Sequence, residues 1–204
     1  MAYSDFKTLD QVVQAFGLKV SSQVLFDWCP AIEPTEFFKL LLKRELDWAK
    51  AVGTEKARSE ALILQTLLEV REQTHQQISV FSGREFNVDP VRGLNGYCDF
   101  LISQDPQQLI INAPVLIIAE AKKGDLDLGM GQCVAAMVAA QAFNAQQQKP
   151  ISTIYGTITS GTLWRFLKLE GQNLIVDLTD YPILPINRLL GILQSITQRS
   201  VAAE

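Results

Sequence analysis

The sequence predicts an α/β (α+β) layer fold, in which helices flank a mixed central sheet. Two observations predict it. The spacing of apolar residues changes from a helical to a strand period after residue 77, and an alanine-rich helical segment later separates two groups of strand-like segments. A sheet with helices on both of its faces is a usual way to bury elements in that order. The length of 204 residues fits one domain with a real hydrophobic core.

Two amphipathic segments at the start of the chain predict helices. The first covers residues 4–16, with Ser4 or Thr8 as its N-cap. The second begins at Thr35 and is rich in phenylalanine and leucine. We therefore expect residues 1–53 to form an N-terminal helical extension that packs on the rest of the chain.

The main domain, residues 54–204, begins with a predicted helix from near Thr54 to about His75. Strand-like segments follow, and turns that contain glycine, proline, asparagine or aspartate separate them. A second helix interrupts the strands, and a third begins at Pro185. The predicted strands are residues 78–81, 85–88, 97–103, 115–119, 151–159, 162–170 and 174–178, and the interrupting helix is residues 125–147.

The strand of residues 115–119 has only apolar side chains, which is typical of a central strand covered on both faces. Glu120-Ala121-Lys122 follows it directly. Because residues two apart in a strand point to one face, Glu120 and Lys122 should emerge side by side. Ligands favour the carboxyl end of strands in open α/β sheets. The alternative is an ordinary strand end with an incidental ion pair.

Two further acidic residues interrupt apolar patterns. Asp99 lies among aromatic and aliphatic residues of a predicted strand, where a buried carboxylate needs polar partners or a cation. Glu60 shares a helical stripe with three leucines, which predicts that it faces the core. The simpler explanations are a bond from Asp99 to backbone amides near Asn95-Gly96, and a favourable interaction of Glu60 with the helix dipole.

Together these residues predict a site for a hard divalent cation. Asp99 and Glu120 should lie on adjacent strands, and their oxygens suit Mg²⁺ (or Mn²⁺), which binds carboxylates, water and phosphate. Glu60 is expected to orient a metal-bound water or to bind a second ion. Lys122 is expected to hold the attacking water or to offset charge on the phosphate. Gln132, on the following helix, should face the sheet and add a neutral contact, or else point to solvent.

The single histidine excludes most other hydrolytic chemistry. His75 has no second histidine with which to form an HExxH motif, a Cys/His zinc module or a paired-histidine metal site. No GxSxG motif accompanies it, and no P-loop occurs. We therefore expect chemistry that depends on carboxylates, a lysine and a hard metal ion.

The chain is expected to be cytoplasmic. Its three cysteines, Cys29, Cys98 and Cys133, are isolated and odd in number, which favours reduced thiols. The longest apolar run is far shorter than the ~20 residues of a membrane span. The N-terminus lacks the pattern of a signal peptide, so we expect no association with a membrane.

This ordered set of residues resembles the PD-(D/E)XK nuclease superfamily, the restriction-endonuclease-like phosphodiesterases. The resemblance covers about residues 54–180. The residues that carry it are an acid on a helix (Glu60), an acid at the start of a strand (Asp99), Glu120-Ala121-Lys122 at the end of the next strand, and Gln132 on the helix that follows.

The resemblance implies a restriction-endonuclease-like fold and Mg²⁺-dependent hydrolysis of nucleic-acid phosphodiesters by an endonuclease, with DNA as the expected substrate. It implies that Asp99 and Glu120 are metal ligands and that Lys122 is the catalytic lysine. Glu60 becomes an auxiliary acid. The residue before Asp99 is Cys98, where the family has proline; that position takes no part in the chemistry.

The charge of the chain is the main observation against a strong DNA binder. Acidic residues outnumber basic ones by 22 to 18, which gives a net charge of −4. A free-standing DNA binder is usually basic. We therefore expect weak intrinsic affinity for DNA. The basic residues expected to contact phosphates are Lys56, Arg58, Arg84, Arg92 and Lys123.

Two alternatives stay open. One is a catalytically weak or inactive scaffold or binding protein of the same fold. Residues 1–50 would then provide a surface for a homodimer or a protein partner, although packing on the core would also explain their apolar side chains. The other is a phosphoesterase that uses the same metal site on a small substrate. The apolar side chains in question are Phe37, Phe38, Leu41 and Leu42.

Overall fold

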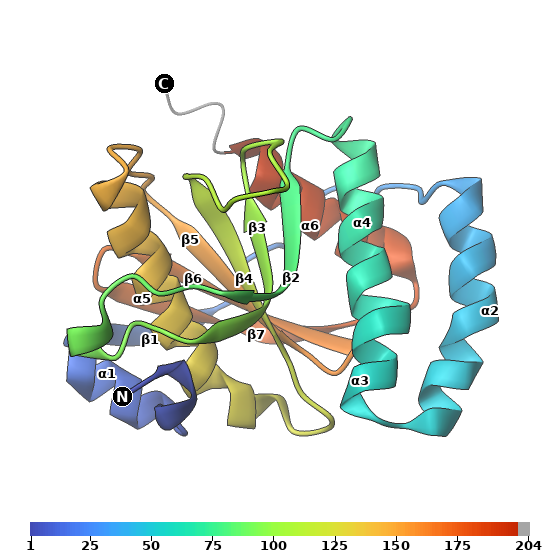
Figure 1. Cartoon of the computed structure of the whole chain (residues 1–204). Coiled ribbons are helices and arrows are strands. Elements are labelled where there is room, and N and C mark those ends of the chain that lie inside the picture. Colours follow the sequence, from blue (N-terminus) through green and yellow to red (C-terminus); the bar gives the residue numbers. More distant parts are fainter. Residues whose placement is uncertain (200–204) are drawn as a thin grey trace.

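A mixed sheet of seven strands runs through the middle of the computed structural model, which describes residues 1–199 (Figure 1). The strands are β1 (Lys19–Gln23), β2 (Ser79–Glu85), β3 (Tyr97–Ser103), β4 (Val115–Ala121), β5 (Ile154–Thr159), β6 (Leu163–Glu170) and β7 (Asn173–Pro182). Their spatial order is β1-β7-β6-β5-β4-β3-β2. Helices cover both faces, which confirms the predicted combination of a central sheet and flanking helices.

The helices begin where the sequence offers caps. Thr8 Oγ1 accepts a hydrogen bond from the backbone N of Gln11, and Thr35 Oγ1 accepts one from Phe38, so both predicted threonine caps are confirmed. The helices are α1 (Leu9–Phe16), α2 (Glu36–Val52), α3 (Glu55–Arg58), α4 (Leu64–Gln73), α5 (Met130–Gln146) and α6 (Ile186–Arg199).

Strand β4 is the centre of the sheet, as its apolar sequence predicts. It pairs antiparallel with β3 and parallel with β5. Every residue of β4 is buried, because helices cover the sheet on both sides. The charged residue that this strand contains, Glu120, is therefore buried as well.

One face of the sheet is covered by α5 and α1 (Figure 1). α5 consists largely of small and apolar residues that are buried. The segment Leu126–Gln146 has the length and composition of a membrane-spanning helix, and in this structure it serves as the core helix of this layer.

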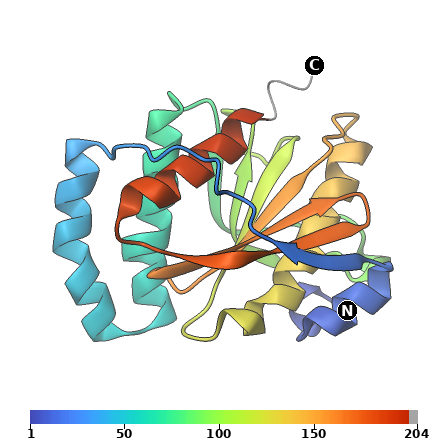
Figure 2. The same cartoon turned by 180° about the vertical axis from the view of Figure 1, so that it is seen from behind.

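The other face is covered by α6 and by the helices between residues 36 and 73, with α2 as the outermost helix (Figure 2). The buried carboxylate of Glu69 links two of them. It accepts hydrogen bonds from the backbone N of Thr35 at 2.7 Å and from Thr35 Oγ1 at 2.9 Å, so it fixes the start of α2 against α4.

The helix predicted from near Thr54 to about His75 contains a π-helical segment, η2 (Ser59–Ile63), between α3 and α4. A π turn holds an extra residue, so the side chains before it are rotated about the axis relative to those after it. Leu67 is buried while Leu68 is 40% exposed. Glu60 is exposed, so the prediction that it lies on the buried stripe is wrong.

The N-terminal residues 1–53 pack on the core, but they are not wholly helical. β1 forms an edge of the sheet, parallel to β7. All five residues of β1 are exposed, and they show no alternation of apolar and polar side chains from which a strand could be predicted. Val12 and Phe38 belong to the hydrophobic clusters on opposite faces of the sheet.

Candidate active site

Two neighbouring strands bring together the acidic residues at the centre of the site. β3 and β4 are antiparallel, and their register pairs Phe100 with Ala119. One residue further along, Asp99 stands opposite Glu120. Side chains in directly opposite positions share a face of the sheet, with Cβ atoms about 5 Å apart. The structure thus places the two carboxylates together, as the sequence predicts.

Glu120 is 2% exposed, and its Oε1 accepts a hydrogen bond of 2.6 Å from Lys122 Nζ. Burial, followed by the charge of Asp99, raises the pKa of the Glu120 carboxyl to about 8, although Lys122 opposes the shift. Desolvation acts to lower the pKa of Lys122, but the Glu120 carboxylate raises it overall. Near neutral pH, Lys122 is charged and Glu120 holds a proton more tightly than an ordinary glutamate.

A backbone hydrogen bond fixes Asp99. Its Oδ2 accepts from the backbone N of Ala121 at 2.8 Å, so the carboxylate is directed at the end of β4. The simpler explanation from the sequence, a bond to amides near Asn95-Gly96, is not what the structure has. Gly96 N donates to Asn87 instead. Among the described residues, no donor is bonded to the second oxygen of Asp99.

Glycine at position 129 lets the start of α5 approach the acidic pair. Gly129 ends the short turn η4 (Leu126–Gly129) that leads into α5. A Cβ atom on Gly129 would lie 3.1 Å from Lys122 Cγ and 3.3 Å from Glu120 Cγ. The backbone of η4 therefore packs directly against the stems of both side chains and restricts how far they can turn.

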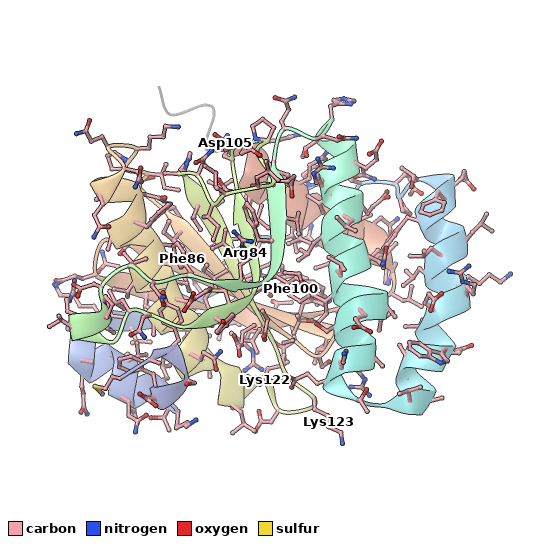
Figure 3. The ribbon with its side chains drawn as sticks, in the orientation of Figure 1. Arg84, Phe86, Phe100, Asp105, Lys122 and Lys123 are labelled. Carbon is pink, nitrogen blue, oxygen red and sulfur yellow. The ribbon has the colours of Figure 1, made fainter. Side chains whose placement is uncertain are left out.

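The loop after β4 also contacts the first helix of the main domain. Arg58 Nη1 donates to the backbone O of Lys123 at 3.1 Å. Figure 3 shows Lys122 and Lys123 at the end of β4, between the turn before α5 and the start of α3. Arg58 and Lys123 are thus the basic residues at the rim of the site.

Two other basic residues expected to contact phosphates have their guanidinium groups engaged in other contacts. Arg84 Nη2 donates to the backbone O of Leu109 at 3.4 Å, and its guanidinium lies over the ring of Phe81. In the register of β2 with β3, Arg84 pairs with Cys98, the residue before Asp99, but its guanidinium is engaged by Leu109 and Phe81 rather than by the acidic pair (Figure 3). Arg92 lies over the ring of Phe16. The basic rim of the site is therefore small.

The structure does not bring Glu60 to the acidic pair. Its side chain is 63% exposed, and its Oε1 is 3.9 Å from Lys56 Nζ. Another acid of this helical segment, Glu55, makes a small contribution through its charge to the raised pKa values of Glu120 and Lys122. Nothing in the sequence distinguishes Glu55, because an acid in the first turn of a helix is expected without any site.

Gln132 lies one turn after Gly129 on α5. It precedes Ala136 and Ala139 at helical spacing, and both alanines are buried as expected of a stripe that faces the sheet. The side chain of Gln132 is partly buried and makes no hydrogen bond with the described residues. Its amide therefore has no fixed contact with the acidic pair or with Lys122.

A second charged cluster lies in the same row of the sheet, and no pattern in the sequence predicts it. Ile158 on β5 pairs with Glu120 on one side and with Arg165 on the other. Arg165 donates to both carboxylate oxygens of Asp180, at 2.7 and 2.8 Å. It also bonds to Asp127 in η4. Arg165 thereby ties the turn before α5 to the sheet and supports the wall of the site.

Within residues 1–199, no group of three or more histidine, cysteine, aspartate or glutamate side chains is placed to hold a metal ion. The acidic pair supplies two carboxylates. Comparisons of the chain with family models, with curated proteins and with solved structures found no significant match. The function must therefore be inferred from the chemistry of the site.

Proposed function

We propose that this protein is a Mg²⁺-dependent endonuclease that hydrolyses phosphodiester bonds of nucleic acid, with DNA as its substrate. The observation that carries the proposal is the directly opposed pair of Asp99 and Glu120, with Lys122 bonded to Glu120. Like charges in opposite positions destabilise a sheet, and a buried carboxylate is costly. A bound cation would offset both costs. The same three residues carry the resemblance to the PD-(D/E)XK nucleases.

The acidic pair suits a hard divalent cation. Mg²⁺ usually takes one or two carboxylates and completes its shell with water and substrate phosphate, so two protein ligands are sufficient. Asp99 and Glu120 would hold the ion. When bound, it would supply a Lewis acid and a water of lowered pKa beside the scissile phosphate. Mn²⁺ accepts the same oxygen ligands and is expected to substitute for Mg²⁺.

Lys122 is the proposed catalytic lysine. Its ammonium lies at the same end of β4 as the acidic pair and is bonded to Glu120, and its stem packs against Gly129. A charged donor that is fixed in advance can stabilise the negative charge that develops on the phosphate during attack. Glu55, rather than Glu60, is the proposed auxiliary acid that accepts a hydrogen bond from the attacking water.

The basic rim is expected to give weak binding of nucleic acid. Arg58 and Lys123 flank the site, whereas Arg84 and Arg92 are engaged elsewhere. Affinity for nucleic acid and its dependence on salt both increase with the number of phosphates that basic residues neutralise. We therefore expect a shallow dependence of binding on salt concentration and no strong binding without the metal ion.

Cleavage assays with Mg²⁺ or Mn²⁺ test the proposal. Supercoiled, single-stranded and branched DNA are incubated with the wild type, Glu120→Gln and Lys122→Ala. Both variants should lose roughly 100-fold or more of the cleavage rate, because each removes a group that acts on the transition state. Glu60→Gln is the matched control and should keep most of the activity. If the wild type cuts none of these substrates with either ion, the protein is not the proposed nuclease.

A binding protein of the same fold without catalytic activity is the second candidate. The exposed apolar side of α2 favours it, because contiguous apolar surface on a soluble protein commonly marks an interaction site. A wild type that binds DNA in the presence of Mg²⁺ but never cuts it would support this candidate over the nuclease.

A further inference from the structure

Large apolar side chains are exposed along the outer side of α2, and we name this set the outer stripe. Phe37 is 74% exposed, Leu40 is 70%, Trp48 is 50% and Val52 is 45%. The stripe contains one charged residue, Arg44. Successive members are three or four residues apart, so they lie on one side of the helix.

The outer stripe is distinct from the side of α2 that packs on the protein. The inner side is buried in the hydrophobic cluster beneath the helix, and a third side carries most of the charged residues. Figures 1 and 2 agree that α2 is the outermost helix of its layer, with no other described element beyond it. The buried inner residues are Phe38, Leu42, Leu46 and Ala49.

The charges along α2 are complementary to those of the same helix turned end to end. The first half of the helix contains Lys39, Lys43 and Arg44 against one acid, Glu36. The second half contains two acids, Glu45 and Asp47, against one base, Lys50. An antiparallel pair of α2 helices brings Lys43 and Arg44 of each copy toward Asp47 and Glu45 of the other, and it also opposes the helix dipoles favourably.

We propose that the outer stripe binds a second copy of this chain, so that the protein is a two-fold symmetric dimer through antiparallel α2 helices. A two-fold interface requires a surface that is complementary to itself. Centred between Arg44 and Glu45, the pair places Phe37 opposite Val52 of the second copy. Leu40 then lies next to Trp48 of the second copy, on either side of a central group of charges.

The central group explains why a charged residue stands within an apolar stripe. Within one chain, Arg44 Nε is 2.7 Å from Glu45 Oε1. In the proposed dimer the two Arg44–Glu45 pairs meet at the two-fold axis, so each guanidinium gains a second carboxylate. A parallel arrangement would instead bring Arg44 against Arg44, which is unfavourable. This inference is independent of the proposed nuclease function.

Sedimentation equilibrium of the full chain and its variants tests the proposal. The wild type should have twice the 22.7 kDa mass of one chain at micromolar concentration. Leu40→Glu, which places a charge in the stripe, should return the mass to that of one chain. Leu178→Glu is the matched control, since Leu178 is 66% exposed on β7 and lies outside the stripe; it should remain a dimer.

Exchanging the central charges tests the antiparallel pairing itself. Arg44→Glu leaves only acids at the centre and Glu45→Arg leaves only bases, so each variant alone should be a monomer. A mixture of the two variants should form a dimer, because each then supplies the charge that the other lacks. Circular dichroism of each variant checks that it is folded.

Three results would overturn the proposal. They are a wild type of single-chain mass, a wild-type dimer that Leu40→Glu leaves intact, and a mixture of folded charge variants that fails to associate. Binding of the wild-type monomer to lipid vesicles or to another protein through the same stripe would contradict it equally.

Discussion

The two helical layers of this protein differ in how they are packed. In the α5 layer, backbone lies against backbone, and a Cβ atom on Gly131 would lie only 2.4 Å from the carbonyl O of Phe6. The layer that contains α2 has large side chains on both its inner and its outer side, and Phe37 on the outer side is 74% exposed. One layer is closely packed, and the other has an exposed apolar surface.

The two layers therefore have different roles, one in positioning the site and one in association. The α5 layer holds Glu120 and Lys122 against Gly129, so small changes there should alter the geometry of the site. The outer stripe of α2 faces solvent, so changes there should alter association and leave the fold intact. The predictions that follow test this separation, from the largest expected effect to the smallest.

The buried acid of the α5 layer should make stability depend on pH. Glu120 has a pKa of about 8 in the folded state, against an ordinary value of 4.5. As the pH rises from 4.5, the unfolded chain loses this proton first, so the free energy of unfolding falls until the folded state is also deprotonated. The fall should reach roughly 1.4 kcal/mol per pH unit, on the order of 5 kcal/mol in total over the interval between the two pKa values.

Urea unfolding in a chelator at several pH values measures this effect as the difference between the wild type and Glu120→Gln. The free energy of unfolding of the variant should lack this part of the pH dependence. The variant should therefore become more stable relative to the wild type as the pH rises. Glu60→Gln should follow the wild type. If the free energies of unfolding of the wild type and Glu120→Gln change in parallel from pH 4.5 to about 8, burial does not raise the pKa of Glu120.

Close packing in the α5 layer predicts that Gly131→Ala is strongly destabilising. The new Cβ would meet the backbone carbonyl oxygens of Phe6 and Thr8, which cannot rotate away. We expect a loss of about 3 kcal/mol in the free energy of unfolding. Gly124→Ala is the matched control, because nothing lies within 4 Å of its Cβ position. Equal stability of the two variants would mean that the layer has room to adjust.

Substitutions on the inner side of the α2 layer should lower the free energy of unfolding more than substitutions on its outer side. Glu69→Ala removes the carboxylate that accepts from Thr35 N and from Thr35 Oγ1. The start of α2 then loses its anchor on α4, and we expect a cost of about 2 kcal/mol. Thermal unfolding compared with Glu72→Ala, an exposed acid on the same helix, measures it. A cost no greater than that of Glu72→Ala would assign Glu69 no role in stability.

The smallest effect is expected on the outer stripe. Leu40→Ser should change the free energy of unfolding by less than about 0.5 kcal/mol at dilutions where the protein is monomeric, because Leu40 is 70% exposed. Chemical denaturation followed by circular dichroism provides the measurement. A cost comparable with that of Glu69→Ala would mean that the stripe packs on its own chain.

The sequence was most informative where local pattern and burial agree. The apolar run before Glu120 predicts a central strand, and the alternation of side chains then places Glu120, Lys122 and Asp99 correctly. The same periodic argument failed for Glu60, because η2 adds a residue to its helix and turns Glu60 toward solvent. A π turn depends on tertiary packing and leaves no mark in the apolar spacing.

Other features were beyond prediction because they depend on distant residues. β1 forms through pairing with β7, about 150 residues away, and its own side chains are all exposed. Glu69 belongs to a stripe of polar residues by sequence, yet Thr35 makes its burial favourable. Arg165 and Asp127 meet only because η4 packs against the sheet.

Calorimetric titration of the metal-free protein with Mn²⁺ and Mg²⁺ tests the central claim most directly, that Asp99 and Glu120 form a divalent cation site. The wild type should bind the ion with release of protons near neutral pH, because Glu120 must ionise. Asp99→Asn and Glu120→Gln should abolish binding, whereas Glu60→Gln should not. A wild type that binds neither ion, or binding that survives the loss of both carboxylates, would contradict the account.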